Sequence, residues 1–397
     1  MRIALTTSVV QRGRSGVGQY VLSLVRALLP MARRHEFSLY VLEDDLPLFA
    51  FAEGSMRLIP VSETHRPPVR DILWHQAILP DLLIRSGIDV LHVPSYRRML
   101  WRRPCALVAT IHDLAPFRLA GKYDRARMFY GRVVARKLAQ RQDQIIAVSR
   151  LTADDIVHYF GIQPEQVTVV PNGLDHGRFQ PGAADHSEAR GPSLARGIDS
   201  PFFLYVARFE HPAKNHVRLI QAFERVRANG VPWKLVLGGG DWHGSEAIHA
   251  RIDASPQKAH IHRLGFIAPD QLPGWYRSAG ALAFPSLYEG FGLPVAEAMA
   301  CGCPVLSSLR GGLAEVAGTA ALPLEPEDSL QMADQMTRIA RDPSLARSLR
   351  EAGLAQARRF DWGAVADATL GIYARAASTA RTQAAAPAAA SLPTLPR

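Results

Sequence analysis

The chain begins MRIALTTSVVQRGRSGVGQYVLSLVRAL (residues 1–28), a stretch that predicts a strand, a glycine-containing loop and a helix in succession. Residues 2–10 form an apolar run, and apolar side chains from Val17 to Leu28 then follow the 3.6-residue period of a helix. Similar units recur, with apolar runs at Phe37–Leu42, Asp89–Val93, Ala106–Ile111, Gln144–Val148 and Val167–Val170. Short apolar strands that alternate with helices predict a parallel sheet covered on both faces.

A second series of the same kind begins at Phe202–Val206 and ends in helical patterns from Glu327 onward. Its other predicted strands are Leu235–Leu237, Ile261–Leu264, Ala281–Phe284 and Val305–Leu306. Residues 181–200, between the two series, are polar and show no period of 2 or 3.6, which indicates a linker with an insertion. The predicted fold class is therefore α/β, with two doubly wound, Rossmann-like parallel-sheet domains at 1–180 and 201–358.

Residues 359–376 are predicted to form a C-terminal helix. One arrangement for this helix is to cross back to the first domain. The tail 377–397 is rich in Ala, Pro, Ser and Thr and is expected to be disordered, because it cannot bury a core. Three cysteines occur, and Cys301 and Cys303 stand too close for ordinary disulfide geometry, which favours a reducing compartment. Neither a signal peptide nor an apolar run of about 18 residues is found, so we expect a cytoplasmic protein.

The net charge is concentrated in one segment. Of the 46 Lys and Arg residues only five are lysines, a bias that phosphate binding or a GC-rich genome would each produce. Residues 97–141 hold twelve basic side chains against two acidic ones, an excess equal to the +10 of the whole chain. Such a segment suits an anionic membrane surface, a phosphate-bearing substrate or nucleic acid. Nucleic acid is disfavoured because no reading motif and no interleaved aromatic residues accompany the charge.

The most informative chemistry lies in LYEGFGLPVAEAMACGCPV (287–305). A loop leads into a helix there, so backbone amides at the positive helix end are predicted to hold an anion or sugar hydroxyls, at Gly290, Phe291, Gly292 and Leu293. Glu297 stands among apolar residues of that helix, where a carboxylate needs hydrogen-bond donors such as sugar hydroxyls. The alternative is that Glu297 faces solvent and Glu289 only caps a turn.

Glu289 and Glu297 match the E-x7-E motif of glycosyltransferase family 4, the retaining GT-B enzymes that use nucleotide-sugar donors, and the chain resembles that family over most of its length. Four further stretches match in the family's order: SGVGQY (15–20), TIHDLAP (110–116), VVPNGLD (169–175) and VARFEHPAKN (206–215). The resemblance implies an acceptor-binding domain at 1–180, a nucleotide-sugar domain at 201–358, and a reaction in the cleft between them.

The resemblance also implies roles for individual residues. Arg208 and Lys214 follow a predicted strand and would contact the donor diphosphate, where two cations stabilise the charge of the leaving group. His112 would line the donor sugar with Asp113 beside it, although a histidine at a strand end is structural at least as often. The implied catalytic residues are thus His112, Asp113, Arg208, Lys214 and Glu289. The implied donor-binding residues also include Gly16, Gly18, Gly265, Phe266, Glu297 and the loop Gly290, Phe291, Gly292 and Leu293.

Two other kinds of site are disfavoured. The first glycines have the order G-x-x-G-x-G, whereas a dinucleotide fold needs G-x-G-x-x-G, and Glu43 only loosely meets its acidic position. No D-x-D sequence and no zinc-ligand spacing of Cys or His occurs. We therefore expect no metal and no cofactor, with the nucleotide sugar as a co-substrate.

Residues Thr110–Pro116 and Ser15–Tyr20 look most like bacterial mannosyltransferases that build lipopolysaccharide or exopolysaccharide. This likeness favours transfer of mannose from GDP-mannose to a glycan or lipid-linked acceptor; UDP-glucose and a rhamnose donor remain alternatives. A non-catalytic nucleotide-sugar-binding protein is the alternative of another class. The predicted helix Tyr123–Gln140 mixes apolar and basic residues, which is compatible with lying on a bilayer and also with an ordinary domain helix.

Overall fold

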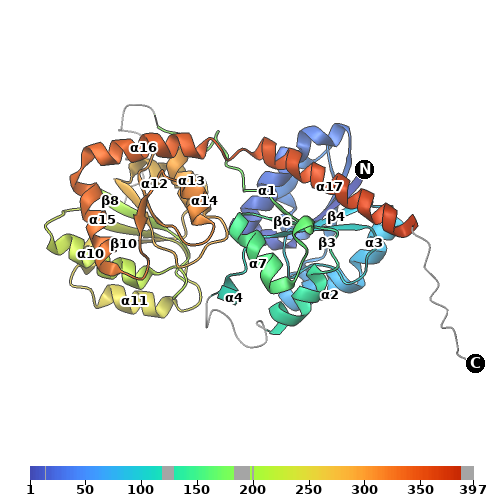
Figure 1. Ribbon diagram of the computed structural model, residues 1–397, viewed down its shortest axis with the longest axis horizontal. Helices are drawn as coiled ribbons and strands as arrows, with labels where there is room; N and C mark the ends of the chain where they lie inside the picture. Colours follow the sequence, from blue (N-terminus) through green and yellow to red (C-terminus); the bar gives the residue numbers. More distant parts are fainter. Residues whose placement is uncertain (14, 119–128, 183–196, 199–200, 386–397) are drawn as a thin grey trace, which may run out of the picture.

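The computed structural model describes residues 1–13, 15–118, 129–182, 197–198 and 201–385, which form two α/β units side by side (Figure 1). The start of the predicted helix Tyr123–Gln140, most of the predicted linker 181–200 and the last twelve residues of the predicted tail lie outside this description.

Within the described residues the first unit has a sheet of seven parallel strands, in the order β3-β2-β1-β4-β5-β6-β7. These strands are β1 (Arg2–Thr6), β2 (Glu36–Leu42), β3 (Arg57–Val61), β4 (Val90–Val93), β5 (Ala106–Ile111), β6 (Gln144–Ala147) and β7 (Val167–Val169). The predicted parallel sheet is confirmed. Strand β3 is missing from the prediction because it lies at the sheet edge, contains Pro60 and buries only one residue fully.

The helical segments of the first unit pack around this sheet. They are η1 (Ser8–Gly13), α1 (Gly16–Leu28), η2 (Leu29–Arg33), η3 (Glu43–Ala52), η4 (Glu63–His65), α2 (Pro68–Ala77), α3 (Leu79–Arg85), α4 (Ala115–Arg118), η5 (Tyr130–Ala135), α6 (Arg136–Ala139), α7 (Arg150–Phe160) and η6 (Pro164–Gln166). The described part of the predicted helix Tyr123–Gln140 is helical but irregular, because η5 has π-helical hydrogen bonding and α6 follows it directly.

The second unit has six parallel strands among the residues that the structure describes, in the order β10-β9-β8-β11-β12-β13. They are β8 (Phe202–Val206), β9 (Lys234–Gly238), β10 (Ile261–Gly265), β11 (Ala281–Phe284), β12 (Val305–Ser308) and β13 (Leu322–Leu324). The surrounding helices are α10 (His216–Ala228), α11 (Ser245–Asp253), η7 (Lys258–His260), α12 (Leu272–Ser278), α13 (Leu293–Ala300), α14 (Leu313–Ala317), α15 (Ser329–Arg341) and α16 (Pro343–Ala357). The predicted fold class, two doubly wound parallel sheets, is confirmed.

Each sheet has a point at which its strand order reverses. In the first sheet β1 lies between β2 and β4, and in the second sheet β8 lies between β9 and β11. Ligands of doubly wound folds bind beyond the carboxyl ends of the strands at such points. The loops after β1, β8 and β11 are therefore the parts of the fold that position a site.

The last helix, α17 (Trp362–Ala385), returns to the first unit (Figure 1). It packs on α1 and β5, and its buried residues recur at spacings of three and four: Val365, Ala366, Thr369, Ile372, Tyr373, Ala376 and Ala377. The expectation that the chain is disordered from residue 377 is wrong up to Ala385. Alanine is the best helix former, and Ala376 and Ala377 also contribute to the core of the first unit.

The chain passes from the first unit to the second after β7 and returns before α17, and these two passages are bonded to each other. The amide of Leu174 donates to the carbonyl of Phe360 at 3.1 Å, and the His176 ring lies 2.9 Å from the same carbonyl oxygen. Gly173 packs so closely on Trp362 that a Cβ at this position would lie 2.6 Å from the indole ring. At the junction between the units, the outgoing segment is therefore bonded to and packed on the returning segment.

In the part of the chain that the structure describes, no helix is both long and apolar enough to cross a bilayer. Cys105, Cys301 and Cys303 are free thiols; Cys301 and Cys303 are buried in the core of the second unit, as expected for packing residues.

Candidate functional site

A cavity of about 270 Å³ lies between the two units, at their strand-order reversals. Gly16, Gln19 and Tyr20 at the start of α1 line it from the first unit, and Trp362 lines it from the beginning of α17. The second unit contributes residues from the loops after β8, β9 and β10 and from the start of α13: Arg208, Gly239, Phe266, Leu293 and Glu297. Among the implied donor-binding residues, Gly16, Arg208, Phe266, Leu293 and Glu297 thus meet in one cavity.

The two glycines of the first loop have different surroundings. Ser15 caps α1 by accepting the amide of Gly18 at 3.0 Å. A Cβ on Gly18 would lie 2.5 Å from the carbonyl oxygen of Val10, whereas a Cβ on Gly16 would meet nothing within 4 Å. Gly18 therefore lets α1 pack on η1, and of these two glycines Gly16 borders the cavity. The donor-binding role implied for Gly18 stays a prediction.

Lys214 and Glu289 form an ion pair, with Lys214 Nζ 2.6 Å from Glu289 Oε1. Lys214 lies in the loop after β8 and Glu289 in the loop after β11, and the two strands are neighbours. Tyr205 donates to the carbonyl of Lys214 at 2.6 Å, and the Asn215 side chain donates to the carbonyl of Pro285 at 3.0 Å. The first bond holds the loop after β8 on its own strand and the second ties it to the loop after β11, so that a cation and a carboxylate lie next to each other at the carboxyl ends of the strands.

Arg208 is held by two neighbours. Its guanidinium lies 4.7 Å from the centroid of the Trp242 ring and donates to Glu210 at 3.1 Å. Half of the Arg208 side chain remains exposed beside the cavity. Because the guanidinium of Arg208 stacks on Trp242, some of its N–H donors remain available for a phosphate.

Glu297 is not solvent-facing, because it lies on α13 and borders the cavity. Burial raises the pKa of its carboxyl, and Tyr276 donates a hydrogen bond to Oε2 at 2.8 Å. With Tyr276 as its donor among the described residues, this carboxylate keeps acceptor capacity for ligand hydroxyls.

His112 follows β5 and is packed edge-on against the ring of Tyr20, with the ring centroids 4.7 Å apart. Burial lowers the pKa of His112 to about 4, against the opposing effects of Asp113 and a backbone hydrogen bond to Pro94. Its Nε2 is buried and has no hydrogen-bond partner among the described residues. A neutral imidazole with a free buried nitrogen can bond a ligand hydroxyl. Asp113 has a structural contact as well, since it accepts the Ala115 amide at 3.0 Å and so caps α4.

A chain of buried polar groups supports this histidine. Tyr20 and Thr110 hydroxyls lie 3.2 Å apart, and His92 lies 2.7 Å from both Thr110 Oγ1 and the hydroxyl of Tyr373 on α17. The C-terminal helix is therefore linked to the residue that packs on His112. No sequence pattern predicts these hydrogen bonds, because Tyr20 and Tyr373 occupy apolar helical positions that look like ordinary core.

The second unit holds further residues that the sequence analysis missed. Gly238, Gly239 and Gly240 line the cavity after β9, and a Cβ on Gly239 would lie 1.9 Å from the carbonyl oxygen of Ala207. A run of three glycines directly after a strand was a usable signal. Trp242 and Tyr276 gave none, since their contacts to Arg208 and Glu297 arise only on folding. Gly265, at the end of β10, has a φ of +70° and turns the chain toward Phe266, which is more than half exposed.

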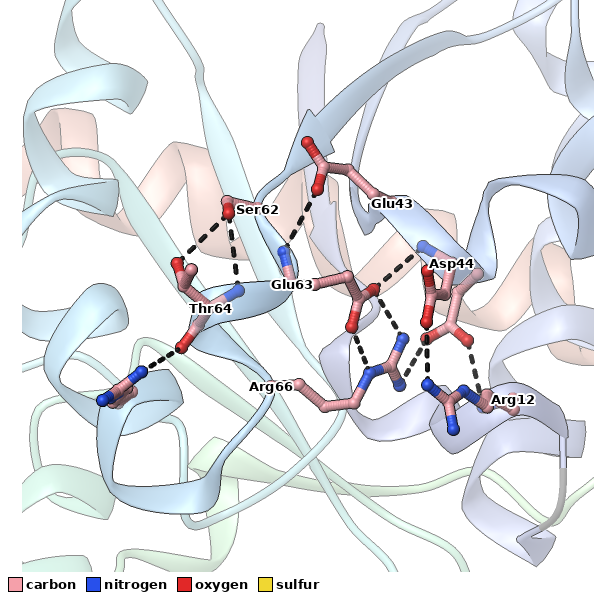
Figure 2. Close-up of polar contacts among 9 residues, drawn as sticks. Arg12, Glu43, Asp44, Ser62, Glu63, Thr64 and Arg66 are labelled. Atoms are coloured by element: carbon pink, nitrogen blue, oxygen red, sulfur yellow. Dashed lines mark hydrogen bonds and ion pairs between the residues drawn. The ribbon is translucent and has the colours of Figure 1, made fainter.

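The loops after β1, β2 and β3 are tied together by ion pairs at the edge of the first unit (Figure 2). Arg12 donates to Asp44 at 2.7 Å, and Arg66 donates to Glu63 at 2.5 Å and to Asp45 at 3.2 Å. Glu43, the loose match to a dinucleotide pattern, accepts the amide of Glu63 at 3.3 Å (Figure 2). This network fixes the rim of the first unit at the carboxyl ends of its strands.

Two family descriptions match the chain. Residues 14–178 match the family described as Glycosyltransferase Family 4, and residues 191–356 match the family described as Glycosyl transferases group 1. The boundary between the two matches falls in the polar stretch between the units.

Individual proteins are similar over nearly the whole length. The chain is 25% identical to the O-antigen chain mannosyltransferase B of Escherichia coli, over 94% of this chain and 99% of that protein. It is 31% identical to the D-inositol 3-phosphate glycosyltransferase of Actinosynnema mirum, over 86% of this chain and 81% of that protein. In fold it resembles Anabaena HepE, solved in complex with UDP and glucose, with a TM-score of 0.73, 19% identity and coverage of 94% and 99%.

Buried histidines make the stability of the protein depend on pH. Burial lowers the pKa of His92 to about 3, of His112 to about 4 and of His216 to about 3. The unfolded chain binds protons at these histidines near pH 6.5, whereas the folded chain does not, so the free energy of unfolding should fall as pH decreases from about 6.5 toward 4. Each histidine contributes at most about 1.4 kcal/mol per pH unit.

Urea unfolding between pH 7 and pH 5 measures this slope. His216→Phe should make the slope shallower, because the ring packs between Tyr205 and Phe209, where phenylalanine does not titrate. An unchanged slope in this variant would show that the buried histidines are not responsible.

Proposed function

The chain belongs to glycosyltransferase family 4, and we propose that it transfers mannose from GDP-mannose to a glycan or lipid-linked acceptor in cell-surface polysaccharide synthesis. The observation that carries the proposal is the cavity between the two units, which brings Gly16 of one unit to Arg208, Phe266 and Glu297 of the other. A donor bound there lies between the two strand-order reversals.

The residues of the second unit suit a nucleoside diphosphate. Arg208 and Lys214 stabilise negative charge as the diphosphate leaves, and the N-terminus of α13 adds a partial positive charge. Glu297 accepts hydrogen bonds from hydroxyls of the donor. Phe266, whose ring is exposed at the cavity wall, contacts the nucleotide base. A preorganised set of this kind needs no further ligand to hold the phosphates, which supports transfer without a metal.

Two residues act at the sugar. The free Nε2 of His112 holds a hydroxyl of the transferred hexose. Glu289 directly precedes Gly290, whose backbone packs against the carbonyl of His112. Lys214, paired with Glu289, links the sugar end to the phosphate end. In this proposal the anomeric configuration is retained, because the acceptor-side motifs offer no carboxylate other than Asp113 as a general base for inversion, and Asp113 caps α4.

Mannose is favoured as the transferred sugar by the similarity to the Escherichia coli mannosyltransferase, which spans nearly all of both chains. Donors with UDP and glucose or with rhamnose are the alternatives. A non-catalytic nucleotide-sugar-binding protein is disfavoured, because binding alone would not require the Lys214–Glu289 ion pair or the close packing of Gly290, next to Glu289, on the carbonyl of His112.

Turnover of nucleotide sugars by the purified protein tests the proposal. We expect GDP-mannose to be consumed fastest in a panel that includes UDP-glucose, with no loss of rate in EDTA. Lys214→Ala and Glu289→Ala should each lower the turnover rate about 10²–10³-fold, because each removes a preorganised electrostatic partner. Lys258→Ala and Glu351→Ala, at exposed positions of the same unit, are the matched controls and should leave the rate unchanged.

Circular dichroism of the variants shows whether the fold is kept. A near-normal rate in either site variant, with the fold intact, would contradict the assigned roles; strong inhibition by EDTA would contradict transfer without a metal.

We also propose that the first unit docks on the anionic cytoplasmic face of a membrane. The structure corrects the charge count behind this idea, because Arg98, Arg102 and Arg103 of the segment 97–141 are neutralised by carboxylates elsewhere in the unit. Arg118 is likewise paired, with Asp155. The cations left exposed on η5 and α6 are Arg132, Arg136 and Lys137.

Exposed apolar side chains accompany these cations. Phe129 and Val133 are exposed beside Arg132, and Trp101 is exposed in the loop after β4. The Trp101 amide donates to Gln76 of α2, one turn after the exposed Leu73, so the loop and α2 adjoin. Apolar groups beside cations on one unit fit a lipid surface, to which each basic residue adds about 1 kcal/mol.

Co-sedimentation with phosphatidylglycerol-containing vesicles measures this docking. Binding should decrease as salt increases and should weaken in a variant with Arg132, Arg136 and Lys137 replaced by Gln. The same change at Arg347, Arg358 and Arg359, exposed on or after α16, is the control and should have little effect. Absence of binding at low salt, or equal binding by both triple variants, would contradict membrane docking.

A further inference from the structure

The first two turns of α7, in the first unit, are in contact with the second unit. The amides of Arg150 and Leu151 donate to the Glu315 carboxylate of α14, at 3.0 and 3.2 Å. The first amides of a helix have no partner within the helix, and a carboxylate is their favoured ligand. Ser149 caps α7 from its own unit by accepting the amide of Thr152. The start of α7 is therefore completed only when the two units are closed on each other.

One turn further along α7, Asp155 forms a second contact. Its side chain is fully buried and accepts hydrogen bonds from Arg118 of the first unit at 2.9 Å and from the hydroxyl of Tyr288 at 2.7 Å. Tyr288 belongs to the loop after β11 and directly precedes Glu289. Burial and the bond to Asp155 raise the pKa of Tyr288, so its hydroxyl stays a donor. If the units separated, the Asp155 carboxylate and the Tyr288 hydroxyl would each lose a hydrogen-bond partner.

The loop that carries Glu289 is held on two sides. A Cβ on Gly290 would lie 1.7 Å from the carbonyl oxygen of His112, and the Thr152 hydroxyl lies 3.5 Å from the carbonyl oxygen of Gly290. On the other side, the Gly312 amide donates to the carbonyl of Glu289 at 2.8 Å, and a Cβ on Gly312 would lie 2.2 Å from the Gly290 carbonyl oxygen. The backbone at Gly290 is thus packed so tightly between His112 and Gly312 that no side chain could be accommodated at position 290 or 312.

We infer that Asp155 and Tyr288 are positioning residues that hold Glu289 and Gly290 against His112 when the two units are closed. This inference rests on the proposed function for the reaction that the closed arrangement serves. Both contacts continue into the candidate site: Tyr288 precedes Glu289, and Arg118 lies in α4, whose first residue, Ala115, donates its amide to Asp113. The Asp155–Tyr288 bond therefore connects the loop after β11 in the second unit to the region of His112 in the first unit, although neither residue lines the cavity.

Tyr288→Phe tests the inference, because it removes the hydroxyl and keeps the ring. Loss of a hydrogen bond to a buried charge should lower kcat about ten- to hundredfold. The dissociation constant of the free nucleoside diphosphate, measured by calorimetry, should change less than twofold, because Arg208, Lys214 and Phe266, the main groups proposed to hold the nucleotide, lie within the second unit. Asp155→Asn should lower kcat at least as much, because it removes the charge that Tyr288 bonds and also weakens the pair with Arg118. The double variant should lose little more than Asp155→Asn alone, since both changes act on the Asp155–Tyr288 contact.

Asp143→Asn is the matched control. Asp143 is also a buried aspartate that accepts from an arginine, Arg103, and from a backbone amide, that of Leu107 at 2.8 Å. It precedes β6, whereas Ser149 and α7 follow β6, so it lies at the opposite end of the strand from the second unit. This variant can lower the melting temperature but should leave kcat unchanged.

Hydrogen–deuterium exchange provides a readout that does not need activity. Among the described residues, the amides of Arg150 and Leu151 have Glu315 of the other unit as their acceptor, so they should exchange faster in Tyr288→Phe than in the unaltered protein. Unchanged exchange at these amides would overturn the inference even if no donor is found. A kcat within twofold of normal, or effects of Tyr288→Phe and Asp155→Asn that add in full, would overturn it where turnover is measured. If the unaltered protein turns over no nucleotide sugar but the exchange responds as expected, the proposed function fails and the closure contact stands.

Discussion

The site depends on the junction between the two units, where the two segments that connect the sheets are hydrogen-bonded to each other. Leu174 and Phe360 join the outgoing and returning segments by a backbone hydrogen bond, and Trp362 packs on Gly173 where no side chain would fit. Helix α17 then buries an apolar stripe in the core of the first unit. The second unit is therefore held at a fixed junction, with the carboxyl ends of its strands directed at those of the first. A cavity lined by both units follows from this junction, since Trp362 itself forms part of the wall.

Electrostatics divide the candidate site into two ends. Arg208 on Trp242 and Glu297 under Tyr276 belong to the second unit and suit the nucleotide, whereas the free nitrogen of His112 belongs to the first and suits a sugar. The Lys214–Glu289 pair joins the loops after β8 and β11 of the second unit, and the second of these loops is bonded to the first unit through Tyr288 and Asp155. Catalysis that depends on both units must then depend on how firmly they close, because neither end carries the complete set of groups.

The sequence was a good guide where the signal is local. Fully buried strands such as β5 and β11 are continuous apolar runs, and both sheets were predicted from them. Edge strand β3 escaped prediction because its exposure is irregular, and α17 was cut short because an Ala-rich stretch looks the same in a helix and in a disordered tail. The site followed the same rule. Arg208 and Glu297, which the motifs singled out, line the cavity. The packing of Gly18, the contacts of Trp242 and Tyr276 and the bond to Asp155 join segments that are distant in sequence, so no period or spacing predicts them.

Transfer of a hexose with retained configuration is the central claim, and the anomeric configuration of the product tests it most directly. The purified protein would be given an α-linked nucleotide sugar and an acceptor, and the new linkage would be read from the NMR signals of the anomeric carbon and proton. An α-linked product agrees with a donor held between His112 and the Glu289 loop in the closed arrangement. A β-linked product would show inversion and would contradict the roles assigned to these residues.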